Sequence, residues 1–546
     1  MKIRVSNSLF VILVSAVLWQ PVSAGADYYD PPARVARLSY SRGSVSFQPA
    51  GDSEWGDAVP NLPIITGDNL WAGENSRAEV RIGSKAIRLD HDTGISFLTI
   101  TDHRIQLRLM QGSLIVHIRH LGNEDLEVDT PNLAFSPQTA GEYRIDVNQE
   151  GTETVITTLQ GEGEATGPWE PHPVLSGQQA RFSANAAIDV DAGEISSTDE
   201  FADWASERDR REDDVESANY VSREMTGYED LDEYGEWSNV TGYGVVWVPL
   251  VVPAGWVPYR FGHWVCVQPW GWTWVDDSPW GFAPFHYGRW AWVDGHWCWV
   301  PGPIVAQPVY APALVVFLGG PGVSWLPLAP GEVFIPQYRT SPGYVHSLNM
   351  SNTMVSLATV DKVHSRYSRG SSTPASQITY LNQQVANAVT AVSHDAFVSG
   401  RPVARGVMNV PQKRADASGA LPTVPAPVKN RIAGQGRPAR SVPPAAIFDR
   451  PTLTRSLSTA VTPPTGKTPS WKPSPGNRHP IPVADQTPTG KSLPSRNPAR
   501  SHTPDLSTPN PPTSARSKVE PQTAHPARSR VQPAKKPASE AQPKSE

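Results

Sequence analysis

Tryptophan is concentrated in one short stretch of this chain, where it could do one of two things. Eleven of the 19 tryptophans lie between residues 247 and 299. An exposed indole can stack on a sugar ring, whereas a buried indole supplies a large apolar surface and needs a partner for its N–H group. The sequence leaves a small aromatic core and a set of stacking platforms both open. The candidate platforms are Trp264, Trp270, Trp272, Trp274, Trp280, Trp290, Trp292 and Trp297.

Polar residues lie among these tryptophans and could form hydrogen bonds to a ligand bound there. Asp276, His286 and Arg289 are the candidates for orienting the hydroxyl groups of a glycan. The three histidines of the block, at 263, 286 and 296, are 23 and 10 residues apart, which fits no compact metal-ligand motif. We therefore predict no metal site and no cofactor.

Catalysis has little support in the residue pattern. Glycoside hydrolysis needs two carboxyl groups about 5–10 Å apart, and Asp276 and Asp277 are adjacent in sequence. Neighbouring residues of a strand point to opposite faces, so this pair is badly placed to act together. The sequence contains no nucleophile elbow, phosphate-binding loop or dinucleotide fingerprint. We predict that the chain is not an enzyme and has no catalytic residues.

The two cysteines, Cys266 and Cys298, both lie in the tryptophan-rich stretch. In an oxidising compartment they can form one disulfide that closes a loop of about 30 residues, a stabilisation on the order of 3 kcal/mol. Two buried free thiols are the alternative, because Cys also packs well as a small apolar side chain.

The elements that would position these residues are short strands. Aromatic residues alternate with others at period two in 270–274 and 290–292, which indicates strands. Glycine and proline between the aromatic phrases indicate tight turns. Residues 227–403 are therefore predicted to form a small aromatic-rich β-meander domain.

A second β-domain is predicted before it, over residues 34–182. Short alternating segments such as 78–82 and 143–147 are separated by glycine-rich turns, a pattern typical of a β-sandwich or β-roll. A connector helix is predicted over 197–223, where Ser197 and Glu200 form a capping box. The predicted fold class is mainly β, with one connector helix and a long disordered C-terminal tail.

Several phrases of the N-terminal part resemble a known family. Gly67-Asp68-Asn69-Leu70, Leu109-Met110-Gln111-Gly112-Ser113-Leu114, Asp129-Thr130-Pro131, Gly141-Glu142-Tyr143-Arg144-Ile145-Asp146-Val147 and Leu175-Ser176-Gly177-Gln178-Gln179-Ala180 occur in the order found in FecR-like domains. FecR is a membrane-spanning regulator of a sigma factor. We expect this chain to have neither the cytoplasmic segment nor the retained membrane span of that protein, so the resemblance implies only its periplasmic β-domain. Residues 227–403 resemble an uncharacterised aromatic- and Gly-rich domain that often follows FecR-like domains in exported Gram-negative proteins.

The first 26 residues have the pattern of a secretory signal peptide. Lys2 and Arg4 precede an apolar run over 9–18, and small residues follow at 22–26. No later segment has the length and composition of a membrane helix. We expect a periplasmic or secreted protein of the Gram-negative envelope, with no transmembrane span after cleavage of the signal.

The C-terminal part differs sharply in composition from the rest. Residues 401–546 contain 23 Lys and Arg against 7 Asp and Glu, and 28 of the 55 prolines follow position 401. Such a segment buries too little apolar surface to fold alone, so 405–546 is predicted to be a disordered basic tail.

The sequence thus predicts a non-enzymatic interaction or sensing protein of the cell envelope, acting through the FecR-like β-domain and the aromatic domain. The alternative is a module that binds a glycan or cell-wall polymer with exposed tryptophans. The expected partner is an envelope protein or an anionic envelope polymer. Basic residues of the tail could neutralise phosphates, but export makes nucleic acid an unexpected partner in the cell.

Overall fold

The fold is mainly β, as predicted, and its sheets include pairings between strands from distant segments of the chain. The computed structural model describes residues 30–183, 186–191, 199–318, 322–368, 379–409, 424–425 and 438–455. All of them belong to the first of two compact units of the chain, Met1–Val461. The predicted signal peptide and most of the predicted tail lie outside the described residues.

The first part of the chain, which we call the β-domain, contains two sheets that share one long strand, β9 (Arg104–Ile118). One sheet has the order β4 (Pro63–Ile64), β1 (Ala36–Arg42), β6 (Arg77–Ile82), β7 (Lys85–Leu89), β9, β12 (Gly141–Val147), β13 (Glu153–Gln160), β16 (Gln178–Ser183), β17 (Ala186–Asp191). The other has the order β3 (Gly56–Asp57), β2 (Val45–Gln48), β5 (Asn69–Ala72), β8 (Thr93–Ile100), β9, β10 (Asp125–Asp129), β11 (Ala134–Pro137), β14 (Glu162–Thr166), β15 (His172–Leu175). The pairing of β9 with β10 is parallel, and the other pairings are antiparallel.

Strand β9 passes from one sheet to the other at a glycine. Its first half pairs with β8, and from Gly112 onward it pairs with β12. Gly112 has a φ of +96°, and a Cβ there would lie 2.3 Å from the hydroxyl oxygen of Thr93. Any other residue would be strained at this point and would also clash. This explains why glycine stands in the middle of this long strand.

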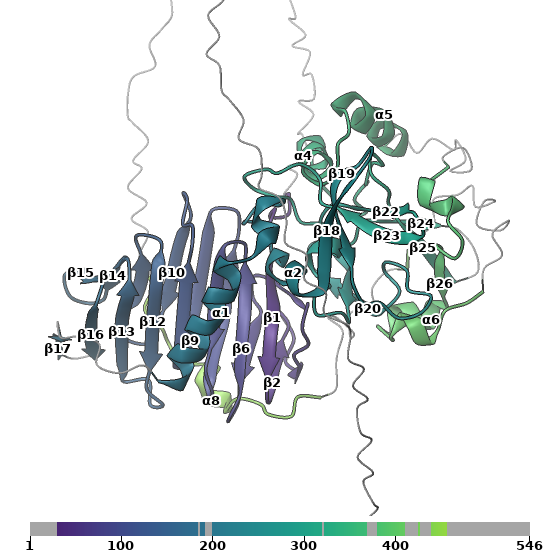
Figure 1. Cartoon of the computed structure of the whole chain (residues 1–546). Helices are drawn as coiled ribbons and strands as arrows, with labels where there is room; N and C mark the ends of the chain where they lie inside the picture. The colour runs from purple at the N-terminus through teal and green to yellow at the C-terminus, as the bar shows by residue number, and fades with distance from the viewer. Residues whose placement is uncertain are drawn as a thin grey trace, which may run out of the picture. The chain divides into compact units, whose positions relative to one another are not determined.

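Alternating burial along the strands produces the core of the β-domain. In β12 every second residue is buried, among them Tyr143, Ile145 and Val147, and the residues between are partly exposed. This is the period-two pattern of a sheet with one face against the core. Figure 1 shows α1 (Glu200–Asp213) lying across the other face of the sheet, over β6 and β9.

Helix α1 begins two residues later than the capping box predicts. Its N-cap is Asp199, whose carboxylate accepts a hydrogen bond from the backbone N–H of Ala202. Ser197 lies outside the described residues. Phe201 and Ala205 of α1 pack with Ile115 of β9, so the helix is fixed to the sheet by an apolar contact as well as by ion pairs.

The aromatic domain contains three small sheets, and not the single meander that the sequence predicts. The first sheet contains β18 (Gly235–Val240), β19 (Gly244–Pro249), β23 (His296–Val300) and β22 (Arg289–Val293). The second contains β20 (Gly262–Val267) and β21 (Gly271–Asp276), and the third contains β24 (Val315–Leu318), β25 (Val323–Pro327) and β26 (Thr390–Val392).

The helices α4 (Pro342–Asn352) and α5 (Leu357–Ser368) were not predicted. Short helices complete the description: α2 (Leu231–Tyr234), α3 (Ala283–His286), α6 (His394–Val398), α8 (Ala445–Phe448), and 3-10 turns at Glu216–Asn219, Tyr228–Asp230, Leu381–Gln384 and Val403–Arg405.

The hairpins form where turn residues permit them. Asp294 and Gly295 connect β22 and β23 with φ values of +49° and +87°. Two successive positive φ angles are the signature of the type I′ turn, whose twist matches that of a hairpin. The turn sets the register that places Trp290 opposite Trp299 and Trp292 opposite Trp297.

Buried polar contacts join the aromatic domain to the β-domain. The Asn61 side-chain amide donates hydrogen bonds to the carbonyl oxygens of Asp276 at 2.9 Å and Ser278 at 2.7 Å. The Arg37 guanidinium donates to the carbonyl oxygen of Pro279 at 2.8 Å and to the Asn61 side-chain oxygen at 3.0 Å. The loop that follows β21 is therefore held by the first strands of the chain.

Part of the predicted tail is ordered, which corrects the prediction for residues 438–455. Ile447 of α8 is buried against Trp71 and Met110 of the β-domain. Arg455 forms an ion pair with Asp125 at 2.5 Å. The sequence did not reveal this because the segment is short and acquires its apolar contacts only from the β-domain.

No helix among the described residues is long and apolar enough to cross a membrane.

Candidate functional site

Most of the tryptophans between residues 247 and 299, which we call the tryptophan block, are buried and form a core. Six of the eight candidate platforms are 5% exposed or less: Trp264, Trp270, Trp274, Trp280, Trp290 and Trp297. Trp272 is partly buried, and Trp292, at the tip of the β22–β23 hairpin, is 44% exposed. A contiguous row of platforms is therefore absent from β21, because Trp270 and Trp274 on either side of Trp272 are covered.

The indole N–H groups show how this core is built. Trp290 donates to the carbonyl oxygen of Pro284 at 2.8 Å, and Trp299 donates to that of Tyr287 at 2.8 Å. Trp325 donates to the carbonyl oxygen of Tyr259 at 2.9 Å. Most buried polar groups in proteins are paired, and the partners of these three indoles are backbone carbonyl groups. These tryptophans hold loops in place.

The three polar residues proposed to orient a glycan are also buried and already bonded. His286 is fully buried and its Nδ1 lies 2.8 Å from the carbonyl oxygen of Ala311. Burial lowers the pKa of His286 to about 3, so the ring is neutral at ordinary pH. Arg289 donates to the carbonyl oxygens of Gly288 and Glu332 at 2.8–3.2 Å, and burial lowers its pKa to about 10. Neither side chain faces an open site.

Asp276 is buried, whereas its neighbour Asp277 is exposed, as expected for adjacent residues at the end of a strand. The Asp276 carboxylate accepts hydrogen bonds from the indole N–H of Trp274 and the backbone N–H of Ser278, both at 3.0 Å. Burial outweighs these bonds and raises the pKa of Asp276 to about 7.

This raised pKa predicts a specific pH dependence. Between about pH 4 and pH 7 the folded protein keeps a proton on Asp276 that the unfolded chain releases, so stability falls as the pH rises through this window. A shift of about 3 pKa units corresponds to a loss on the order of 4 kcal/mol. In the Asp276→Asn variant the free energy of unfolding should fall less between pH 5 and pH 8 than in wild type. Urea unfolding of both proteins at the two pH values measures this, and equal falls would contradict it.

Cys266 and Cys298 are free thiols in the structure, so the hypothesised disulfide is not formed. Cys266 lies opposite Trp272 in the β20–β21 hairpin, whereas Cys298 lies opposite Ala291 in a different sheet. Both are buried, and burial raises the pKa of each thiol. The structure agrees with the second alternative that the sequence left open, two buried free thiols, in which each Cys packs as a small apolar residue.

Among the described residues, no group of three His, Cys, Asp or Glu side chains could hold a metal ion. His263, His286 and His296 are not brought together: His263 faces Asp277 at 3.9 Å, and His296 is exposed beside Asp294.

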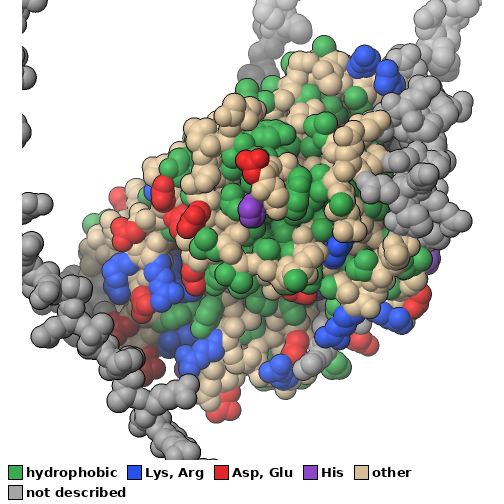
Figure 2. Space-filling view, turned by 45° about the vertical axis from the view of Figure 1, so that its right-hand side comes forward, with side chains coloured by type: hydrophobic (Ala, Val, Ile, Leu, Met, Phe, Trp, Pro, Cys, Tyr) green, Lys and Arg blue, Asp and Glu red, His purple; other side chains and the backbone are tan. Residues whose placement is uncertain are grey.

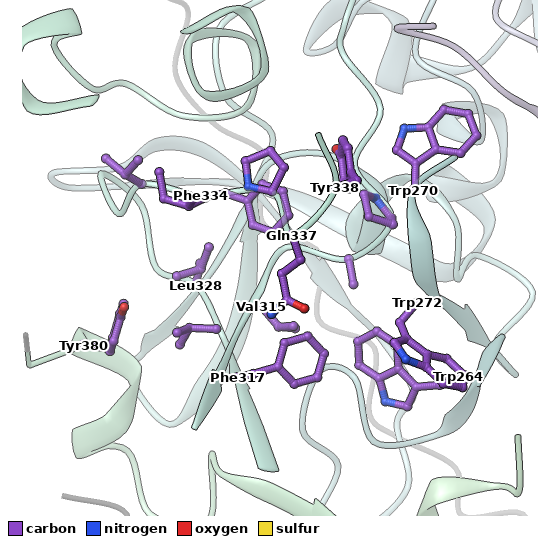
Figure 3. Close-up of a pocket in the computed structure, with 16 residues that line it drawn as sticks. Trp264, Trp270, Trp272, Val315, Phe317, Leu328, Phe334, Gln337, Tyr338 and Tyr380 are labelled. Atoms are coloured by element: carbon purple, nitrogen blue, oxygen red, sulfur yellow. The ribbon is translucent and has the colours of Figure 1, made fainter. Parts of the chain in front are cut away.

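The site that the structure does form is an apolar groove of about 350 Å³ in the aromatic domain (Figure 3). Three of the candidate tryptophans line it, from β20, β21 and the turn between them, together with residues of β24 and of the loop before α4. Figure 3 shows Gln337 extending from this loop toward Val315 and Phe317. The lining residues are Trp264, Trp270, Trp272, Pro312, Ala313, Val315, Val316, Phe317, Leu328, Val333, Phe334, Ile335, Pro336, Gln337, Tyr338 and Tyr380.

The chemistry of this groove is that of binding. Its described lining contains no Asp, Glu, His, Cys, Lys or Arg, and Gln337 supplies its one side-chain amide. Aromatic and aliphatic walls with a few polar groups are typical of ligand sites. Sequence reasoning missed the contribution of 312–317 and 333–338, which carry no motif, and identified only the tryptophans.

Apolar side chains are also numerous on the outer surface of the molecule, as Figure 2 shows. Among those of the aromatic domain, Val251 is 84% exposed and Met354 is 85% exposed. Exposed apolar surface of this kind often marks a site of protein contact.

Comparison with known proteins gives partial matches. Residues 228–332 match the model of a family described only as a family of unknown function, DUF6600, which agrees with the resemblance of this region to an uncharacterised domain. No curated protein matches. Two crystal structures of a candidate anti-sigma factor from Parabacteroides distasonis, at 2.50 and 1.65 Å resolution, are each 13% identical to the chain with a TM-score of 0.21. Each match covers 22% of this chain and 58% of the other protein.

Proposed function

We propose that the chain is a non-enzymatic interaction protein of the cell envelope, periplasmic or secreted, whose aromatic groove binds an extended segment of a partner protein. The observation that carries this proposal is the groove itself, whose described lining is aromatic and aliphatic and contains no charged side chain. A fixed apolar groove on a rigid support is suited to an extended peptide, since its ordered walls need no rearrangement on binding.

The tryptophan core supplies that rigid support. Trp264 contacts Trp274, Phe317, Trp325 and Phe397 with ring centroids 5.3–5.5 Å apart, so the groove wall is continuous with the core. The β-domain, which resembles the FecR-like domain, holds the loop after β21 through Asn61. In this proposal the β-domain is the base of the groove-bearing domain and a second surface for partner contact.

A glycan-binding function is the second candidate, and the exposure of Trp292 and Trp272 is what favours it. It is weaker than the first, because Asp276, His286 and Arg289 are committed to structural hydrogen bonds. A sugar needs polar groups that fix its hydroxyls, and the described groove lining offers one amide and two tyrosines for this purpose.

Photo-crosslinking in cells tests both candidates. A benzoylphenylalanine at position 337, inside the groove, should yield a discrete adduct with one envelope protein, recovered from the periplasmic or secreted fraction. The same group at Asp294, on the exposed turn of β22 and β23, is the matched control and should not yield that adduct. Introducing Val316→Arg on the groove wall should abolish the adduct.

Two results would overturn the proposal. One is the same set of adducts from positions 337 and 294, which would mean that the groove is not selective. The other is an adduct that contains cell-wall glycan and no protein, which would establish the glycan candidate instead. Accumulation of the intact chain in the cytoplasm would contradict the proposed location.

A further inference from the structure

Residues 438–455, which we call the crossing segment, run across the outer face of one sheet of the β-domain. The first of them, Pro438, pairs with Gly56 of β3 in an isolated bridge, and Leu453 pairs with Thr130, which follows β10. Between these ends, α8 lies against β9 (Figure 1). Since β2, β5, β8 and β9 lie between β3 and β10 in the sheet, the segment spans six neighbouring strands.

The outer face of this sheet forms an apolar seat for the segment. Alternate residues of a strand point to opposite faces, and Trp71 of β5 and Met110 of β9 point away from the core of the domain. They are nevertheless only 4% and 0% exposed, because Ile447 of α8 packs on both. Phe448 contacts Trp55, with ring centroids 5.1 Å apart. A pair of apolar residues therefore anchors the segment.

Hydrogen bonds fix the direction of the segment on this seat. The Ser46 hydroxyl of β2 donates to the carbonyl oxygen of Ser441. The Arg450 guanidinium donates to the carbonyl oxygens of Met110 at 3.1 Å and Gln149 at 2.6 Å. Hydrogen bonds from a charged donor are stronger than those between neutral groups, so Arg450 contributes to the attachment although its acceptors are backbone groups.

An acidic edge on β10 receives the end of the segment. Arg455 forms ion pairs with Asp125 at 2.5 Å and with Glu127 at 3.7 Å, and its backbone N–H donates to Glu127 at 2.9 Å. Arg104 of the neighbouring strand pairs with both carboxylates at 3.0 Å. The Glu127 side chain is fully buried, and burying a carboxylate is costly unless it is paired and hydrogen-bonded. The surface is thus complementary to a segment that carries a cation.

The crossing segment is held in the manner of a bound peptide. Of its described side chains, only Pro443 and Ile447 are buried. None of its described residues belongs to the main hydrophobic core of the β-domain. Its helix, α8, has four residues, and a helix of that length is not stable in isolation. We therefore expect the sheet to keep its core without the segment, whereas the segment acquires its order from the sheet.

We infer that this face of the β-domain, from β5 to β10, is a docking surface for short protein segments in which an apolar pair precedes arginines. The crossing segment is its ligand in the same molecule, with the pair Ile447 and Phe448 and the arginines Arg450 and Arg455. A partner protein with the same pattern takes the place of the segment. This inference goes beyond the proposed function, because the surface shares no residue with the described lining of the groove.

The test uses the full chain and a fluorescein-labelled peptide of residues 438–455, followed by fluorescence anisotropy. The double variant Ile447→Asp and Arg455→Glu removes the anchor and the cation of the internal ligand, and should bind the peptide about tenfold more tightly than wild type. In that background, Asp125→Asn removes an ion-pair partner and should weaken binding about fivefold. Glu162→Gln, at an exposed position of β14 in the same sheet, is the matched control and should change affinity less than about twofold.

Two results of this binding experiment would overturn the inference. Equal affinity of the peptide for wild type and for the double variant would mean that the crossing segment does not occupy the surface. Equal affinity for a peptide of the same composition in scrambled order would mean that the pattern is not recognised. Circular dichroism checks that the double variant is folded. If it is not, Arg455→Glu alone replaces it and should tighten binding about threefold.

Photo-crosslinking in cells identifies the partner. Benzoylphenylalanine in place of Trp55 of the double variant should form an adduct with another protein, and the crosslinked peptide should contain an apolar pair followed by arginine. No adduct, or an adduct whose peptide lacks this pattern, would overturn the stated class of partner. If the labelled peptide binds no variant whereas position 337 still forms its protein adduct, the proposed function stands and the inference fails.

Discussion

Truncation of Trp290 to alanine should destabilise the protein by about 3–5 kcal/mol, the range for removing a large aromatic side chain from a packed core. Trp290 is 1% exposed and its ring contacts Trp256, Trp280 and Phe285. Its indole N–H also satisfies the carbonyl oxygen of Pro284, which would be left unpaired.

The matched control lies two residues further along the same strand. Trp292 points to the same side of β22 but is 44% exposed at the hairpin tip. Trp292→Ala should therefore cost less than about 1 kcal/mol. Guanidinium unfolding followed by circular dichroism measures both variants. Similar losses of stability for the two would contradict the division of the block into a core and an exposed tip.

Replacing Glu79 with glutamine should be as damaging in the β-domain, with a cost of about 3–5 kcal/mol. Glu79 is fully buried, and its carboxylate forms ion pairs with Arg81 and Arg88 at 2.8 Å and with Arg208 of α1 at 2.7 Å. Burial alone would raise the pKa of Glu79, but the charges of the three arginines hold it well below its usual value. Without the carboxylate, three guanidinium groups lose a shared partner.

The exposed pair Glu207 and Arg211 of the same helix provides the control. The two side chains are 2.7 Å apart but more than half exposed, so Glu207→Gln should change stability by less than about 0.5 kcal/mol. Hydrogen exchange followed by mass spectrometry should show α1 losing protection in the Glu79 variant only. Unchanged protection of α1 in both variants would mean that its other contacts, such as the packing of Phe201 and the Arg88–Asp209 ion pair, hold the helix without Glu79.

Much of the fold follows from local patterns in the sequence. Alternation over 143–147 and the paired aromatic phrases predict strands, because a strand with one buried face repeats every two residues. The same reasoning predicts a helix after the β-domain from its charged and apolar residues. The predicted cap, Ser197, is two residues from the observed cap, Asp199, because consecutive Ser, Thr and Asp residues at 196–199 are all suitable N-caps.

The sequence does not reveal which tryptophans are covered, because burial depends on contacts between distant segments. Trp270 and Trp272 look equivalent along the chain, yet Trp270 packs on Tyr310 whereas Trp272 remains partly open. The groove is assembled from four separate stretches of the chain, so no local motif marks it. For the same reason, the sequence alone predicts that residues 438–455 belong to the disordered tail. Their apolar partners lie far away in the sequence, in the β-domain.

Oxidative labelling of the full chain, with each tryptophan resolved by mass spectrometry, tests most directly whether the block is a core with one open groove. Trp292 should react fastest and Trp272 more slowly, while Trp264, Trp270 and Trp274 should be protected. Val424 packs against the aromatic core and the carbonyl oxygen of Pro425 accepts a hydrogen bond from the indole N–H of Trp272, so replacing both residues with serine should raise the rate at Trp272 alone. Reaction of Trp270, Trp272 and Trp274 together at the rate of Trp292 would contradict the core and restore a row of stacking platforms.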